Sequence, residues 1–307
     1  MAAILPQNPD LDQLKRQAKE ILKSHKQGNQ DICTVLRQLY RFSSLSDADI
    51  LSSDIKLHEI QFALALEYGF SSWNAIKNYI ENTSSSNKVH KFHRKDGEVW
   101  IEGIPKLDWK DPGACTFIGA LMRALNCIGE PINYVDLMGL SGAAFRFCFA
   151  HPRWDWSSVD GMLGYDHGKA AMDALGYEAG WAEGDKIRSE FVKSIDSGRP
   201  ALGIDLVIAA EWGVITGYAE NGDILLCRTY FDSPGDDYSR TDRLPWLNYL
   251  IGNKKPSPAR RESFLKSLQI ATIIANADGF QSGGGCVYKR GLEGLQTWAD
   301  DLKDRSR

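Results

Sequence analysis

The residues best suited to chemistry gather around Cys115. Residues 111–125 read as a short Pro/Gly turn, a small residue, the cysteine and then an apolar helical run. This order places a thiol at the N-terminus of a buried helix, where unpaired backbone N–H groups and the positive end of the helix dipole favour the thiolate. Cys115 is therefore the candidate nucleophile, and its alternative role is that of a small core residue.

A cysteine nucleophile needs a base, and the chain has no histidine after His167. His167 stands at the start of a predicted helix over residues 165–175, where a surface position is the alternative to a base role. His151 stands in a loop close to Trp154 and Trp156 and could line a cleft. Neither position identifies a base by itself.

The composition and net charge of the chain limit the classes of partner that it can bind. The 307 residues are 43% hydrophobic and 25% charged, which is typical of a globular protein with an adequate core. The formal net charge of -4 gives no concentrated positive surface of the kind that nucleic acid requires. We therefore expect no nucleic-acid partner.

The sequence also predicts a cytoplasmic protein without a membrane segment. The first ten residues lack the basic stretch and apolar core of a signal peptide, and no run approaches the roughly 18 apolar residues that cross a bilayer. The six cysteines are scattered without a CxxC pair, and the six histidines form no HExxH motif. We expect no disulfide framework, no metal and no cofactor.

Residues 1–82 are predicted to form a small all-helical domain. Apolar residues recur at intervals of three and four, and short helices of this kind must pack on one another. Residues 14–22 and the Glu-Tyr-Gly-Phe-Ser-Ser-Trp string at 67–73 resemble a helical module found in bacterial proteins, often ahead of ankyrin repeats. The resemblance implies an accessory domain with a protein partner. His58 lies on its third helix and is expected to be structural or surface-exposed.

Residues 83–95 are polar and then basic, which predicts a solvated linker. Residues 96–307 have a different pattern, in which predicted helices are followed by strand candidates at 201–208 and 213–218. Asn221-Gly marks a hairpin turn before the returning strand at 223–230. A helical block, an antiparallel meander and further helices indicate an α+β domain.

Three stretches of this domain resemble papain-like cysteine enzymes. They are Cys115 with its helix through Gly129-Glu-Pro, residues 136–145, and Glu211-Trp-Gly-Val-Ile-Thr-Gly-Tyr, with a similar closing stretch at 291–302. The nearest groups are leader-peptidase-like domains and the N-terminal domain of the butirosin-biosynthesis acyltransferase. The resemblance implies a papain-like domain, a helical subdomain plus an antiparallel sheet, over residues 96–307.

The resemblance also implies the site. The family's base histidine stands seven residues ahead of the Tyr in the Gly-Tyr motif, and here that position is Glu211. The third triad member would be Asp232, the only acid near the next strand. The family's glutamine, six residues ahead of the nucleophile, is replaced by Trp109.

Several neighbours are expected to contact a substrate or to serve the fold. Trp109, Trp212 and Tyr218 are candidate substrate-binding residues, and the core is the alternative for the last two. Arg228 would bind an anionic group of the substrate or pair with Glu211 and keep it ionised.

The replacement of histidine by glutamate weakens ordinary peptidase chemistry. Transfer of a proton from a thiol to an unperturbed glutamate costs about 5.7 kcal/mol, against about 2.7 kcal/mol for transfer to histidine. Burial can raise the pKa of a glutamate and make it a usable base.

Three functions therefore stay open. The first is a cysteine-dependent hydrolase or acyltransferase that acts on an amide or thioester of a small molecule or peptide. The second is a non-catalytic papain-like module that binds such a ligand. The third is an interaction protein that acts through residues 1–82.

Overall fold

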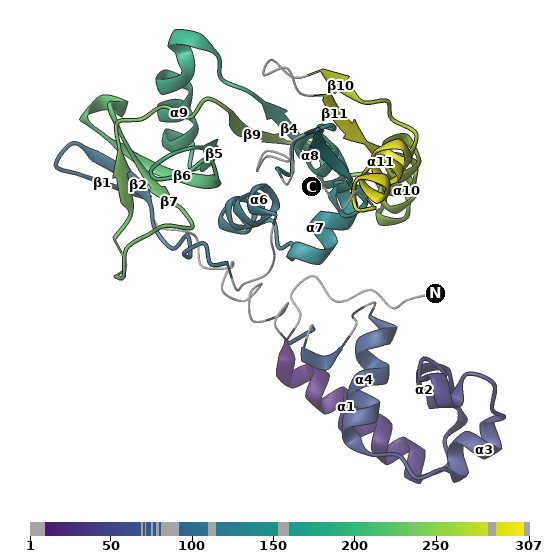
Figure 1. The fold of residues 1–307 in the computed structure, drawn as a ribbon. Helices are drawn as coiled ribbons and strands as arrows, with labels where there is room; N and C mark the ends of the chain where they lie inside the picture. Colours follow the sequence, from purple (N-terminus) through teal and green to yellow (C-terminus); the bar gives the residue numbers. More distant parts are fainter. Residues whose placement is uncertain are drawn as a thin grey trace. The chain divides into compact units, whose positions relative to one another are not determined.

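The computed structural model divides the chain into two compact units, residues 1–88 and 89–307, and each is described by itself (Figure 1). The boundary lies inside the predicted linker. The structure describes residues 10–303 apart from 69, 71, 75, 78, 79, 81–91, 110–114, 153–159, 236 and 282–286.

Helices make up the described part of the first unit. α1 begins where the Asp10 side chain accepts a hydrogen bond from the backbone N–H of Asp12, and its apolar face packs against α4. A 3₁₀ turn over Gln30–Ile32 leads into the short helix α2, and residues 72–79 lie partly outside the described residues. The described helices are α1 (Leu11–Lys26), α2 (Cys33–Leu36), α3 (Asp47–Ser52) and α4 (Leu57–Glu67).

An eight-stranded antiparallel sheet organises the second unit, which is α+β as predicted. Its centre is β6 (Trp212–Ala219), whose eight residues are all buried. On one side β6 pairs with β5 (Ala201–Ile204) and β2 (Glu98–Ile101), and on the other with β7 (Ile224–Arg228). The remaining strands are β1 (Phe92–Lys95), β4 (Tyr177–Gly180), β8 (Ser239–Thr241) and β9 (Asn248–Lys254).

The β6–β7 connection is the hairpin that the sequence predicts. Asn221 adopts a left-handed conformation with φ of 59°, which asparagine tolerates better than most residues. The turn brings the two strands into antiparallel register from Val214↔Arg228 to Ala219↔Ile224. The β6–β7 hairpin thus carries the residues that follow Glu211.

Helix α6 (Thr116–Cys127) lies against the sheet and is the most buried helix of the unit (Figure 1). Ten of its twelve residues are buried, so it serves as the core on which the strands and the other helices pack. α7 (Tyr134–Leu140) packs against α6, α8 (His167–Leu175) packs against α7, and α9 (Ile187–Asp196) packs against β6 and β2 of the sheet.

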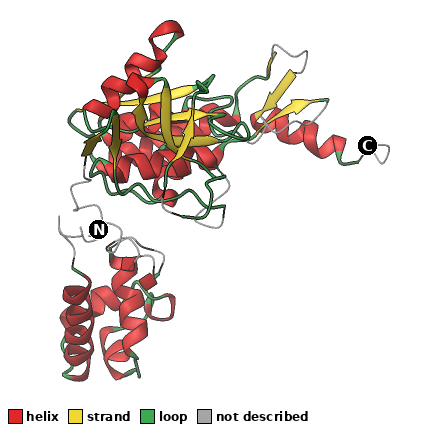
Figure 2. Ribbon diagram, turned by 90° about the vertical axis from the view of Figure 1, so that its left-hand side faces the viewer, coloured by secondary structure: helices red, strands yellow, loops and turns green. Residues whose placement is uncertain are grey.

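The second unit also contains a separate three-stranded sheet, two strands of which come from the C-terminal part of the chain. It pairs β3 (Cys148–His151) with β11 (Val287–Arg290) and β11 with β10 (Phe280–Gln281). α10 (Arg260–Ala275) and α11 (Gly291–Asp301) accompany it, and Figure 2 shows α11 extending away from the large sheet towards the C-terminus. We call β10, β11 and α11 the C-terminal arm.

The structure corrects two expectations about this unit. Residues 92–95, assigned to the linker, form β1 and pair with β2, so they belong to the sheet. The short strands β3, β4 and β8 to β11 were not predicted, because two to seven residues show little periodicity. Among the described helices, none combines the length and the apolar character needed to cross a membrane.

Gly217 provides a test of how closely β6 and β2 are packed. A Cβ atom at this position would lie 2.4 Å from the carbonyl oxygen of Val99 and 2.7 Å from Cβ of Trp100. We expect Gly217→Ala to lower the free energy of unfolding by about 1–3 kcal/mol in urea denaturation. Gly139→Ala in α7 is the control, because a Cβ atom there meets nothing within 4 Å. Equal stability of both variants would contradict this packing.

Candidate functional site

Cys115 is the N-cap of α6, as the sequence predicts. Its backbone is extended, its backbone N–H donates to the Tyr134 hydroxyl at 3.0 Å, and its side chain is half-buried. The turn at 110–114 that leads to it lies outside the described residues. The sulfur packs on Gly161, where an added Cβ atom would lie 2.4 Å from it.

The surroundings of Cys115 keep its thiol neutral. Burial raises its pKa to about 11, and the charge of Asp160 acts in the same direction. The backbone N–H of Ile118, the nearby Arg146 and the backbone N–H of Phe117 favour the thiolate, but they do not offset burial. Cys115 therefore lies at the predicted position at the start of the helix, but its pKa is raised and not lowered as predicted.

Glu211 lies just ahead of β6 and reaches the start of α6, but it bonds to the residue after the cysteine. Thr116 Oγ1 donates to Glu211 Oε2 at 2.8 Å. Burial raises the pKa of Glu211, the hydrogen bond from Thr116 lowers it, and the charge of Asp160 raises it. The described residues form no ion pair with Glu211, so the alternative in which Arg228 keeps it ionised gains no support.

Asp160 is the site residue that the sequence analysis missed. Its two carboxylate oxygens accept from Trp212 Nε1 at 2.8 Å and from the backbone N–H of Met162 at 2.7 Å. It influences the pKa of both Cys115 and Glu211. An Asp-Gly pair in a loop is an ordinary turn signal, so nothing in the sequence distinguished it.

The two aromatic residues predicted on β6 have different surroundings. Trp212 is fully buried, packs edge-on against Phe117 with ring centroids 4.9 Å apart, and orients Asp160. Tyr218 lies at the other end of the strand, and its hydroxyl donates to Asp196 at 2.9 Å. Trp212 therefore belongs to the core beneath the site, and the structure does not bring Tyr218 to Cys115.

Trp109 lies on the surface next to the site. Its side chain is half exposed and packs on the Tyr230 ring, with centroids 4.6 Å apart. Burial raises the pKa of Tyr230, and the charges of Cys115 and Glu211 add to the effect. Trp109 thus remains a candidate contact for a ligand that approaches Cys115.

Asp232 holds a turn together after β7. One of its oxygens accepts from the Thr229 backbone N–H at 2.9 Å, from the Thr229 hydroxyl at 2.9 Å and from the Ser239 hydroxyl at 2.8 Å. Its other oxygen lies 3.5 Å from Arg228. These contacts give Asp232 a structural role, and none of them joins it to Cys115 or Glu211 as a third triad member.

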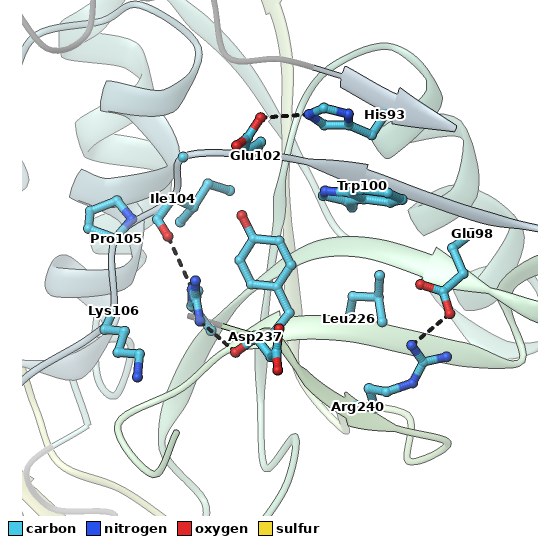
Figure 3. Close-up of a pocket in the computed structure, with 13 residues that line it drawn as sticks. His93, Glu98, Trp100, Glu102, Ile104, Pro105, Lys106, Leu226, Asp237 and Arg240 are labelled. Atoms are coloured by element: carbon cyan, nitrogen blue, oxygen red, sulfur yellow. Dashed lines mark hydrogen bonds and ion pairs between the residues drawn. The ribbon is translucent and has the colours of Figure 1, made fainter. Parts of the chain in front are cut away.

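Arg228 is buried in the wall of a hollow on the unit. Its guanidinium donates to the carbonyl oxygens of Ile104 and Asp237 at 3.1 and 2.8 Å and covers the Tyr238 ring. The hollow measures about 940 Å³ between β2, β7 and β8. Figure 3 shows its sides, where His93 pairs with Glu102 at 2.6 Å and Glu98 with Arg240 at 2.7 Å.

Neither alternative histidine replaces the missing base. His167 is fully buried, not on the surface as expected, and its Nδ1 bonds to the Ser141 carbonyl oxygen at 2.8 Å. Burial lowers the pKa of His167 to about 4. His151 lies 3.5 Å from Asp301 of α11. Within the described ranges, no three His, Cys, Asp or Glu side chains are arranged to hold a metal ion.

The role of Asp232 can be tested by stability. We expect Asp232→Ala to lower the free energy of unfolding by about 2–4 kcal/mol, because it leaves buried donors without their shared acceptor. Lys193→Ala in α9, which loses one ion pair of an exposed side chain with Glu190, is the control and is expected to change stability by less than about 1 kcal/mol. A fully stable Asp232→Ala protein would contradict the structural role.

Two carboxylates lie near the thiol, and their effects on it can be separated. Asp160→Asn removes the charge that raises the pKa of Cys115, so alkylation of Cys115 at mildly alkaline pH should become severalfold faster. Glu211→Gln should change the rate less, because Glu211 does not contribute to that pKa. Circular dichroism checks that each variant is folded. The reverse order of rates would contradict the geometry described here.

The chain was compared with protein-family models, with curated protein sequences and with solved structures. None of the three comparisons finds a match. The site is therefore interpreted from its own geometry.

Proposed function

We propose that residues 89–307 form a papain-like module that binds a small-molecule or peptide ligand beside Cys115 and does not use the resting thiol as a peptidase nucleophile. The order of the three sequence stretches around Cys115, residues 136–145 and Glu211 supports the papain-like assignment. The observation that carries the binding role is the hydrogen bond from Thr116 to Glu211. It engages the carboxylate at the family's base position with a neighbour of the thiol.

The protonation state of the thiol supports the same proposal. With a pKa of about 11, Cys115 is ionised at neutral pH in only roughly one molecule in 10⁴. The charge of Asp160 opposes a thiolate, whereas a histidine partner would favour it once protonated. A site of this kind keeps a small, polarisable sulfur in contact with a ligand without activating it.

A cysteine-dependent hydrolase or acyltransferase is the second candidate. The observation that favours it is that hydrogen bonding from the backbone N–H groups of Phe117 and Ile118 lowers the pKa of Cys115. In this reaction the sulfur would attack the acyl carbon of an amide or thioester, and Glu211 would take the thiol proton. The amine or thiol of the substrate would then leave with a proton. It requires a carboxylate oxygen of Glu211 to reach the Cys115 sulfur, although Thr116 donates to Oε2.

The helical unit and the cellular location complete the proposal. A protein partner for residues 1–82 is a proposal that rests on their resemblance to an accessory module. A cytoplasmic location stays a prediction from the sequence.

Alkylation of Cys115 by iodoacetamide, followed by mass spectrometry over a range of pH, separates the two candidates. Binding without catalysis predicts slow labelling at pH 7 and a rate that still rises above pH 9, in keeping with a pKa of about 11. Cys127 in the same protein is the internal control, because burial raises its pKa to about 12. Labelling of Cys115 that is complete well below pH 8, and far ahead of Cys127, would establish an activated thiol and overturn the proposal.

A further inference from the structure

Exposed apolar side chains are concentrated near the C-terminus of the chain. Of the nineteen large hydrophobic residues that are exposed in the described structure, nine lie between Phe264 and Leu302. Single exposed hydrophobic residues are normal on a protein surface, but a group of this size on two helices and one strand marks an interaction surface.

The orientation of α10 strengthens this interpretation. Two of the four side chains that α10 buries are serines, Ser263 and Ser267, whereas Phe264, Leu265 and Leu268 are about half exposed. An ordinary surface helix buries its apolar face and exposes its polar one. α10 thus presents to solvent an apolar face of the kind that normally packs on another helix.

α10 and α11 carry matching apolar stripes on their exposed sides. Each stripe has spacings of three, four and three residues, which is the pattern of a helix–helix seam. The α11 residues Leu292 and Leu302 are 60% and 67% exposed. The stripes consist of Leu265, Leu268, Thr272 and Ala275 in α10, and of Leu292, Leu295, Ala299 and Leu302 in and just after α11.

We propose that this surface is the interface of a homodimer in which α10 of each copy packs antiparallel to α11 of the other. The antiparallel register places Leu265 opposite Leu302 of the second copy and Ala275 opposite Leu292. In between, Leu268 meets Ala299 and Thr272 meets Leu295, so small residues face large ones at three of the four levels.

Charge favours a second copy as the occupant. α10 carries three basic residues and one acidic residue, whereas α11 carries three acidic residues and no basic one. Packing of α10 against α10 would bring like charges together, and packing of α10 against α11 brings opposite charges together. A two-fold axis forms the α10–α11 contact twice, as expected for an isologous dimer.

The exposed area is also adequate for a dimer. A large apolar side chain that is half exposed leaves on the order of 80 Å² uncovered, so the five leucines of the stripes leave about 400 Å² per copy, and the other four, on the same two helices and β11, add about 300 Å². Stable protein–protein interfaces bury about 800 Å² per partner. The C-terminal arm extends away from the large sheet, as Figure 2 shows, so that a second copy can reach α11.

Analytical ultracentrifugation of the full chain tests the proposal. The wild-type protein should sediment at twice the monomer mass of 34.3 kDa at micromolar concentration. Leu302→Glu and Leu265→Lys should each give monomers, because each places one charge in the apolar seam. The double variant should form dimers again, because the register pairs Lys with Glu across the interface.

Ile208→Glu is the matched control, since Ile208 is 69% exposed and lies outside this surface. It should remain dimeric. Circular dichroism establishes that each single variant is folded, and either variant alone suffices for the test. A monomeric wild-type protein, dimeric single variants or a double variant that stays monomeric would each overturn the proposed interface.

Discussion

The hydrogen bond between Thr116 and Glu211 is the interaction on which the interpretation of the site depends. It joins the first residue of α6 to the residue that precedes β6, and these are the two elements at the centre of the domain. α6 is buried along nearly its whole length and β6 along all of it, so neither element can shift without disturbing the core. The Glu211 carboxylate is therefore held at the start of α6, where it accepts a hydrogen bond from the residue next to the thiol.

Burial of this region has a second consequence, which is electrostatic. The pKa of Cys115, of Glu211 and of Tyr230 is raised by burial in each case, so the groups around the site are neutral over a wider range of pH than in water. A partly apolar site next to the half-exposed ring of Trp109 suits a ligand held by contact and hydrogen bonds. It suits an ionised nucleophile poorly.

Much of the fold could be predicted from the sequence, because its longest elements carry strong periodicity. The helix after Cys115 and the Asn221 hairpin both appear close to their predicted bounds. The short strands of the C-terminal arm could not be predicted, because strands of two to four residues form through pairing with distant partners. The resemblance to papain-like enzymes implied that Cys115 and Glu211 lie at one site, but it could not show that Thr116 donates the hydrogen bond to Glu211. The sequence also could not show that a hydrogen bond from Trp212 holds Asp160 beside the site, since that bond joins residues 52 positions apart.

The central claim is that Cys115 marks a binding site whose thiol is neutral at physiological pH. The most direct measurement is a pH titration of thiolate absorbance in the ultraviolet, recorded as the difference between the wild-type protein and Cys115→Ser. This account predicts no thiolate signal at neutral pH and a midpoint near a pKa of about 11, in keeping with burial of the sulfur. A midpoint below the ordinary thiol pKa of about 8.5 would show an activated nucleophile and contradict the account.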